Sequence, residues 1–130
     1  MGRSAGWLAR TENEWATDDN YAYVVVKLCK TYPNVYCEMG YITELLANDA
    51  DGKVLESVLS NLERARNMDG KYDLMTKIAY GSDWHMPELV TNARRYLNVW
   101  LKIFSLPDYK AYQEQFFWKN GKAYLGPRIS

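Results

Sequence analysis

Two short runs of strand-forming residues lie on either side of a long amphipathic helix pattern, and this order restricts the fold more than any other feature. The runs cover residues 34–39 and 77–80, and the helix pattern starts after Asp51-Gly52 and stops at Asp69-Gly70. The apolar stripe of that helix consists of Val54, Leu55, Val58, Leu59, Leu62 and Ala65. Strands joined by a helix pair in parallel through a crossover. The sequence therefore predicts an α/β fold.

The N-terminal part is expected to hold one helix after a loose start. Residues 1–16 are predicted to be a loose N-terminal segment, and residues 17–130 a single α/β domain. A helix is predicted over 17–31, capped by Thr17 or Asp18, with apolar residues at helical spacing at Tyr21, Val24, Val25 and Leu28. The β-branched run 24–26 would also suit a strand.

Two further helices are predicted after the second strand. The first starts near Pro87, and its inward face consists of Leu89, Val90, Ala93, Leu97, Trp100, Leu101 and Phe104. The second is expected to end at Gly121, and its apolar residues are Tyr109, Tyr112, Phe116 and Phe117. These stripes are typical of a hydrophobic core.

Composition excludes several classes of partner. The 16 basic residues balance the 16 acidic ones, so neither nucleic acid nor an anionic membrane surface is an expected partner. No apolar run approaches the roughly 20 residues that span a bilayer. Cys29 and Cys37 are too few for a disulfide framework and are expected to be buried free thiols. A cytoplasmic location is the corresponding expectation.

The segment 80–85 carries the residues best suited to chemistry. A strand ends at Tyr80-Gly81, and Asp83 and His85 follow where parallel α/β proteins place their ligands. Asp83 there can hold a divalent metal or accept a proton, and His85, the chain's single histidine, can bind metal or an anion. The structural alternative is a turn with a capping aspartate and a hydrogen-bonded histidine.

Three segments resemble the amidohydrolase-related (amidohydrolase 2 type) metal-dependent hydrolases. Residues 78–84, Ile-Ala-Tyr-Gly-Ser-Asp-Trp, are similar to that family's last-strand signature. Residues 32–38, Tyr-Pro-Asn-Val-Tyr-Cys-Glu, resemble its seventh strand. Residues 117–126 resemble its closing helix, with Asn120 at the matching asparagine. The three segments occur in the family's order.

The resemblance implies a partial (β/α)8 TIM-barrel segment with about two parallel strands and four helices. A full barrel takes about 250 residues, so 130 residues correspond to its C-terminal part. Asp83 would be the catalytic aspartate that binds the metal, commonly zinc, and helps to activate water. Glu38, Tyr41 and His85 would contact a small-molecule substrate. The implied reactions are hydrolysis of amide or ester-like bonds, or decarboxylation of aromatic acids.

The sequence departs from that family in its histidines. The first-strand His-x-His pair and the histidines of strands five and six are absent, and one histidine cannot rebuild a site that needs several imidazoles. We therefore expect a fragment that is inactive alone and that lacks the other barrel half. The alternative is a non-catalytic module that associates with itself or with a partner. A stand-alone acid–base cluster of Glu38, Asp83 and His85 is a third hypothesis.

Overall fold

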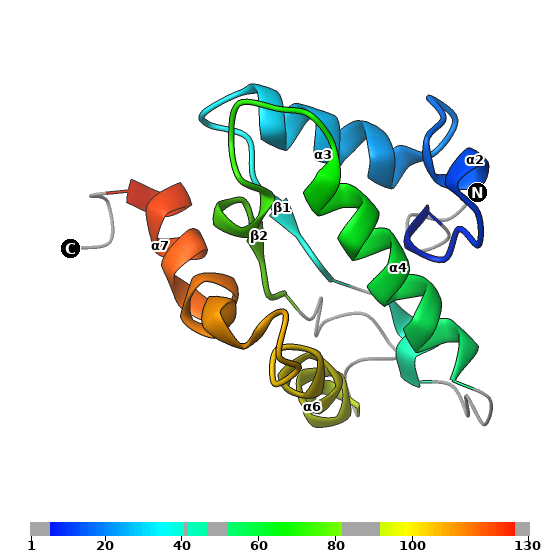
Figure 1. Cartoon of the computed structure of the whole chain (residues 1–130). Coiled ribbons are helices and arrows are strands. Elements are labelled where there is room, and N and C mark those ends of the chain that lie inside the picture. The colour runs from blue at the N-terminus through cyan, green and yellow to red at the C-terminus, as the bar shows by residue number, and fades with distance from the viewer. Residues whose placement is uncertain (1–5, 41, 47–51, 82–91, 127–130) are drawn as a thin grey trace.

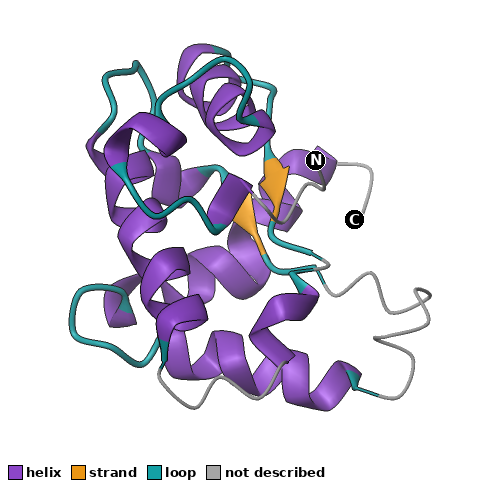
Figure 2. Ribbon diagram, turned by 90° about the vertical axis from the view of Figure 1, so that its right-hand side faces the viewer, coloured by secondary structure: helices purple, strands orange, loops and turns teal. Residues whose placement is uncertain are grey.

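The computed structural model describes residues 6–40, 42–46, 52–81 and 92–126. The elements in chain order are α2 (Glu12–Trp15), α3 (Tyr21–Thr31), β1 (Cys37–Glu38), η1 (Thr43–Leu46), α4 (Lys53–Asn67), η2 (Leu74–Thr76), β2 (Ile78–Ala79), α6 (Ala93–Ile103), η3 (Lys110–Tyr112), η4 (Gln115–Lys119) and α7 (Asn120–Leu125). The segment η4 is a π-helix, and the other η elements are 3-10 turns. Helices dominate, around two short strands (Figure 2). This mixed composition is compatible with the predicted α/β class.

The two strands pair in parallel, as the sequence predicts. Cys37 lies opposite Ile78 and Glu38 opposite Ala79. Figure 1 shows the pair at the centre, with α3 and α4 on one side and α7 on the other. The paired stretch is two residues in each strand, shorter than the predicted runs. Within the described ranges the sheet has two strands.

Helix α4 follows its apolar pattern closely. It starts after Gly52, which has a φ of 71°, and it buries Val58, Leu62 and Ala65 against the core. The predicted stripe is thus confirmed at its centre. One polar residue, Asn61, is also fully buried on this face, where its side chain donates to the carbonyl oxygens of Trp7 and Ala9.

Helix α3 starts later than predicted and buries a different face. Its cap is Asn20, because the Asn20 side chain accepts from the backbone N–H groups of Ala22 and Tyr23. The predicted caps Thr17 and Asp18 are therefore wrong. The apolar residues buried from this helix are Ala22, Val26 and Cys29. Of the predicted apolar series, Tyr21 and Leu28 are exposed and Val24 and Val25 are half-buried.

The N-terminal segment is not loose where the structure describes it. Trp7 and Trp15 are buried in the same hydrophobic cluster as the helices, and their ring centroids lie 5.2 Å apart. The side-chain amide of Asn20 donates to the carbonyl oxygens of Gly6 and Trp15. Large aromatic surfaces and a satisfied backbone hold residues 6–16 in place. The prediction of a loose segment is wrong for these residues.

The C-terminal helices form an aromatic core. The rings of Phe104 and Phe116 stack with centroids 4.1 Å apart, and Trp100 packs on Phe116 at 5.2 Å. Helix α6 buries Tyr96 in place of the predicted Leu101, which is 41% exposed. The buried role predicted for Phe116 is confirmed.

The last helix continues through the predicted stop. Gly121 lies inside α7, and the helix ends at Gly126, which has a φ of 64°. A π-helix precedes α7: the backbone N–H of Asn120 donates to Gln115 O, five residues earlier. Glycine is a stop signal only where the chain needs a positive φ, and here that position is Gly126.

A buried lysine joins the loop before β1 to the residue before β2. The Lys77 ammonium donates to the carbonyl oxygens of Tyr32, Pro33 and Val35 at 2.8–3.2 Å. It also lies 4.5 Å from the Tyr36 ring centroid. Burial lowers the pKa of Lys77, yet three acceptors and a ring compensate the charge. This contact positions β1 beside β2.

Candidate functional site

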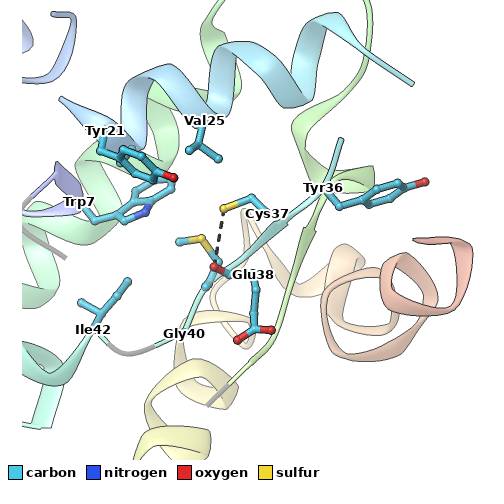
Figure 3. Close-up of a pocket in the computed structure, with 10 residues that line it drawn as sticks. Trp7, Tyr21, Val25, Tyr36, Cys37, Glu38, Gly40 and Ile42 are labelled. Atoms are coloured by element: carbon cyan, nitrogen blue, oxygen red, sulfur yellow. Dashed lines mark hydrogen bonds between the residues drawn. The ribbon is translucent and has the colours of Figure 1, made fainter. Parts of the chain in front are cut away.

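The carboxyl ends of the two strands meet, and Glu38 lies at that point. Glu38 is the last residue of β1, and its side chain covers Gly81, two residues beyond β2. A Cβ atom at Gly81 would overlap the Glu38 Cγ and Cδ atoms. Figure 3 shows the Glu38 carboxylate on the side of β1 opposite to the Cys37 thiol. Glu38 therefore lies at the end of β1, beside the end of β2; its role in substrate binding stays a prediction.

The other predicted site residues are Tyr41, Asp83 and His85. All three lie outside the described residues. Within the described ranges, no group of three His, Cys, Asp or Glu side chains is arranged to hold a metal ion. The structure describes the backbone up to Gly81, and the Glu38 side chain packs directly against Gly81.

Tyr96 supports the backbone that follows β1. Its hydroxyl donates to the carbonyl oxygen of Met39 at 2.8 Å and accepts from the backbone N–H of Ile42 at 3.1 Å. The Tyr96 side chain is fully buried, so both bonds form away from water. Sequence analysis missed this residue. The available signal was its spacing of four from Trp100, which puts both on one face of α6.

A hollow of about 300 Å³ borders the edge of β1 turned away from β2 (Figure 3). Its aromatic and aliphatic walls come from Trp7, Tyr21 and Val25. The Cys37 thiol faces this side of the strand and donates weakly to the Glu38 carbonyl oxygen at 3.7 Å. The wall of the hollow is therefore mixed, with apolar side chains, one thiol and polar groups of Glu38 and its neighbours.

The chemistry of Cys37 does not suit nucleophilic catalysis. Burial, followed by the nearby Cys29 and Glu38 groups, raises the pKa of Cys37 to about 12. Burial also raises the pKa of Cys29. The attacking species in cysteine chemistry is the thiolate, and these environments keep the proton on sulfur. Both cysteines are free thiols, as predicted; Cys29 is buried, whereas Cys37 is half-buried.

The opposite edge of the sheet is covered by the π-helix and α7. The backbone N–H of Tyr80 donates to Phe116 O at 2.9 Å. The Asn120 side chain donates to Ile78 O and to Met75 O, both at 2.7 Å. Helical atoms thus occupy the position where another strand would pair with β2. The two sides of the sheet differ: a helix closes the β2 side, and a hollow borders the β1 side.

Comparison with protein-family models, with curated proteins and with solved structures finds no match for this chain in any of the three. Among the described helices, none combines the length and the apolar character needed to cross a membrane. The site is therefore interpreted from its own residues.

Proposed function

We propose that this chain is an association-dependent module with an amidohydrolase-like strand pair, inactive as an isolated polypeptide. The observation that carries this proposal is helix α3, which is apolar on two faces. One face is buried in the core, while Tyr21 and Leu28 on another face and Tyr32 at the C-cap are 64%, 41% and 50% exposed. An apolar surface of this kind, rich in tyrosine, is typical of a protein interface.

The difference between the two sides of the sheet supports the same proposal. Asn120 already bonds to a carbonyl group of β2, and Phe116 to the N–H of Tyr80 directly after it. A partner therefore approaches from the α3 and β1 side, where Tyr21 and Val25 line the hollow. Association on one side gives a closed complex, whereas two open sides would favour a growing fibre.

A second candidate function is a share in a metal-dependent hydrolase site. It is favoured by the placement of Glu38 over Gly81, because Asp83 follows two residues later in the sequence. Zinc sites in hydrolases use three protein ligands, commonly histidines. The donor set of this chain, with one histidine in total, does not fit such a site by itself. Any hydrolase site therefore needs imidazoles from another polypeptide.

Calorimetric titration of zinc tests whether association of this chain with itself assembles a metal site. The association module is expected to take up no stoichiometric zinc, and Asp83→Asn is expected to leave the titration unchanged. Uptake of one zinc per chain or per dimer that disappears in Asp83→Asn would contradict an inactive module and would justify a screen for hydrolysis. Asp69→Asn, an exposed aspartate after α4, is the matched control.

A further inference from the structure

The apolar side chains on the outer face of α3 and at its C-cap form one stripe. Tyr21, Val25, Leu28 and Tyr32 follow one another at intervals of four, three and four residues. At 100° per residue these positions span about 60° around the helix axis. Tyr32 is the C-cap, the residue directly after the last helical one. Val25 is half-buried in the wall of the hollow, and the other three are exposed. Spacings of three and four residues are those of helix–helix seams.

The stripe is symmetric about its centre. Read in either direction, the order of intervals is four, three, four, with a tyrosine at each end and an aliphatic residue at each inner position. When the helix lies antiparallel to its own copy, Tyr21 faces Tyr32 of the second copy. Val25 then faces Leu28 of the second copy. A surface that complements itself in this way is the mark of a two-fold interface.

We infer that α3 docks antiparallel against α3 of a second copy of this chain, with Tyr21 opposite Tyr32 and Val25 opposite Leu28. The ring of Tyr32 from the second copy then lies at the mouth of the hollow that Tyr21 and Val25 line. This inference specifies the partner in the association proposal and is independent of the hydrolase candidate.

The helix dipoles favour the antiparallel orientation, because each end of α3 then lies beside the opposite end of the second helix. The charged side chains near the two ends are mixed and select neither orientation. Asp18, before the N-terminus of α3, pairs with Lys27 of the same chain at 3.6 Å. At the other end, the exposed Lys71 lies between the exposed Asp69 and Asp73 in the sequence.

The interface is small, because α3 has 11 residues. Interfaces of this size belong to the weak class, so we expect a dissociation constant on the order of micromolar. Because the seam is apolar, added salt is expected to change the dissociation constant little.

Sedimentation equilibrium tests the inference with three proteins. The unmodified chain is expected to move from 15.1 kDa toward twice that mass as concentration rises. Leu28→Glu places carboxylates in the seam and is expected to stay at 15.1 kDa, whereas Leu101→Glu, equally exposed at 41% but on α6, dimerises normally. Circular dichroism checks folding, and Tyr21→Ser is the second seam variant if Leu28→Glu does not fold.

Two results overturn the inference. If the unmodified chain stays at the monomer mass over the whole range of protein concentrations, the chain does not self-associate. If Leu28→Glu folds and dimerises like the unmodified chain, the interface does not involve α3. The chain would then still self-associate, but through another surface.

Discussion

The side-chain amide of Asn120 donates a hydrogen bond of 2.7 Å to the carbonyl oxygen of Ile78, the first residue of β2. The same nitrogen donates to Met75 O, also at 2.7 Å. Asn120 is 2% exposed, so both acceptors are shielded from water. This one side chain therefore fixes the last helix against the sheet.

Replacing Asn120 by Leu is expected to lower the free energy of unfolding by about 3 kcal/mol, because two buried carbonyl groups lose their donor. Urea denaturation measures this change. Asn67→Leu, at the exposed end of α4, is the control and is expected to shift stability by no more than about 0.5 kcal/mol. Equal effects of the two substitutions would contradict the proposed role of Asn120.

Replacing Lys77 by Met is expected to cost about 2 kcal/mol. The substitution removes the ammonium that donates to three carbonyl groups between residues 32 and 35, although it also removes the cost of burying a charge. Denaturant melts of Lys77→Met and of Lys102→Met, an exposed lysine on α6, provide the comparison. A Lys77→Met protein as stable as Lys102→Met would show that the loop before β1 holds its shape without the ammonium.

Stability is expected to fall at alkaline pH partly through Cys37. The pKa of Cys37 rises from 9.0 to about 12 on folding, so above pH 9 the unfolded chain loses a proton that the folded chain keeps. The free energy of unfolding therefore falls as pH rises between about 9 and 12. At pH 10 the Cys37 contribution amounts to about 1 kcal/mol relative to neutral pH.

The test compares the pH dependence of unmodified protein with that of Cys37→Ala. Lys30 and Lys77 have a pKa lowered by burial and act with the opposite sign, but they are present in both proteins and cancel in the difference. The variant is expected to lose less stability between pH 8 and pH 10. Identical slopes would contradict a folded-state Cys37 pKa of about 12.

The two glycines near the C-terminus are expected to respond in opposite ways. Gly121 lies inside α7, and a methyl group on its Cα would meet open space, so Gly121→Ala should stabilise by about 0.5–1 kcal/mol. Gly126 has φ 64° and ψ −158°, a region that only glycine occupies readily, so Gly126→Ala should destabilise by about 1–3 kcal/mol. Thermal melts of both variants measure the difference. Stabilisation by both would mean that α7 does not end at Gly126.

Local patterns predicted the parts of the fold that depend on local chemistry. The stripe of α4 and the parallel pairing of β1 with β2 followed from periodicity and element order. The start of α3 did not, because each of the four polar residues 17–20 can act as a cap, and it is the Asn20 side chain that accepts from the free N–H groups. The burial of Trp7 and Trp15 depends on contacts with distant elements, which a local pattern cannot show.

The candidate site was predictable only in outline. Glu38 could be placed at the strand end because parallel strands end on the same side. Tyr96 supports the backbone after β1 through a hydrogen bond from its hydroxyl to Met39 O. These two residues are 57 positions apart in the sequence, so a local pattern does not reveal the contact. The exposed face of α3 was hidden for another reason: an apolar helical stripe has the same pattern whether a core or a second molecule covers it.

Cross-linking tests the proposed pairing of α3 most directly. Copies carrying Val25→Cys are mixed with copies carrying Leu28→Cys under mild oxidation. The native cysteines are present in both variants, so any dimers that they form appear equally in every sample. Since a disulfide needs Cα atoms within about 7 Å, the antiparallel register predicts covalent dimers mainly between the two different variants. Dimers that form as readily within each variant alone would contradict this register, and an absence of dimers in the mixture would contradict the interface.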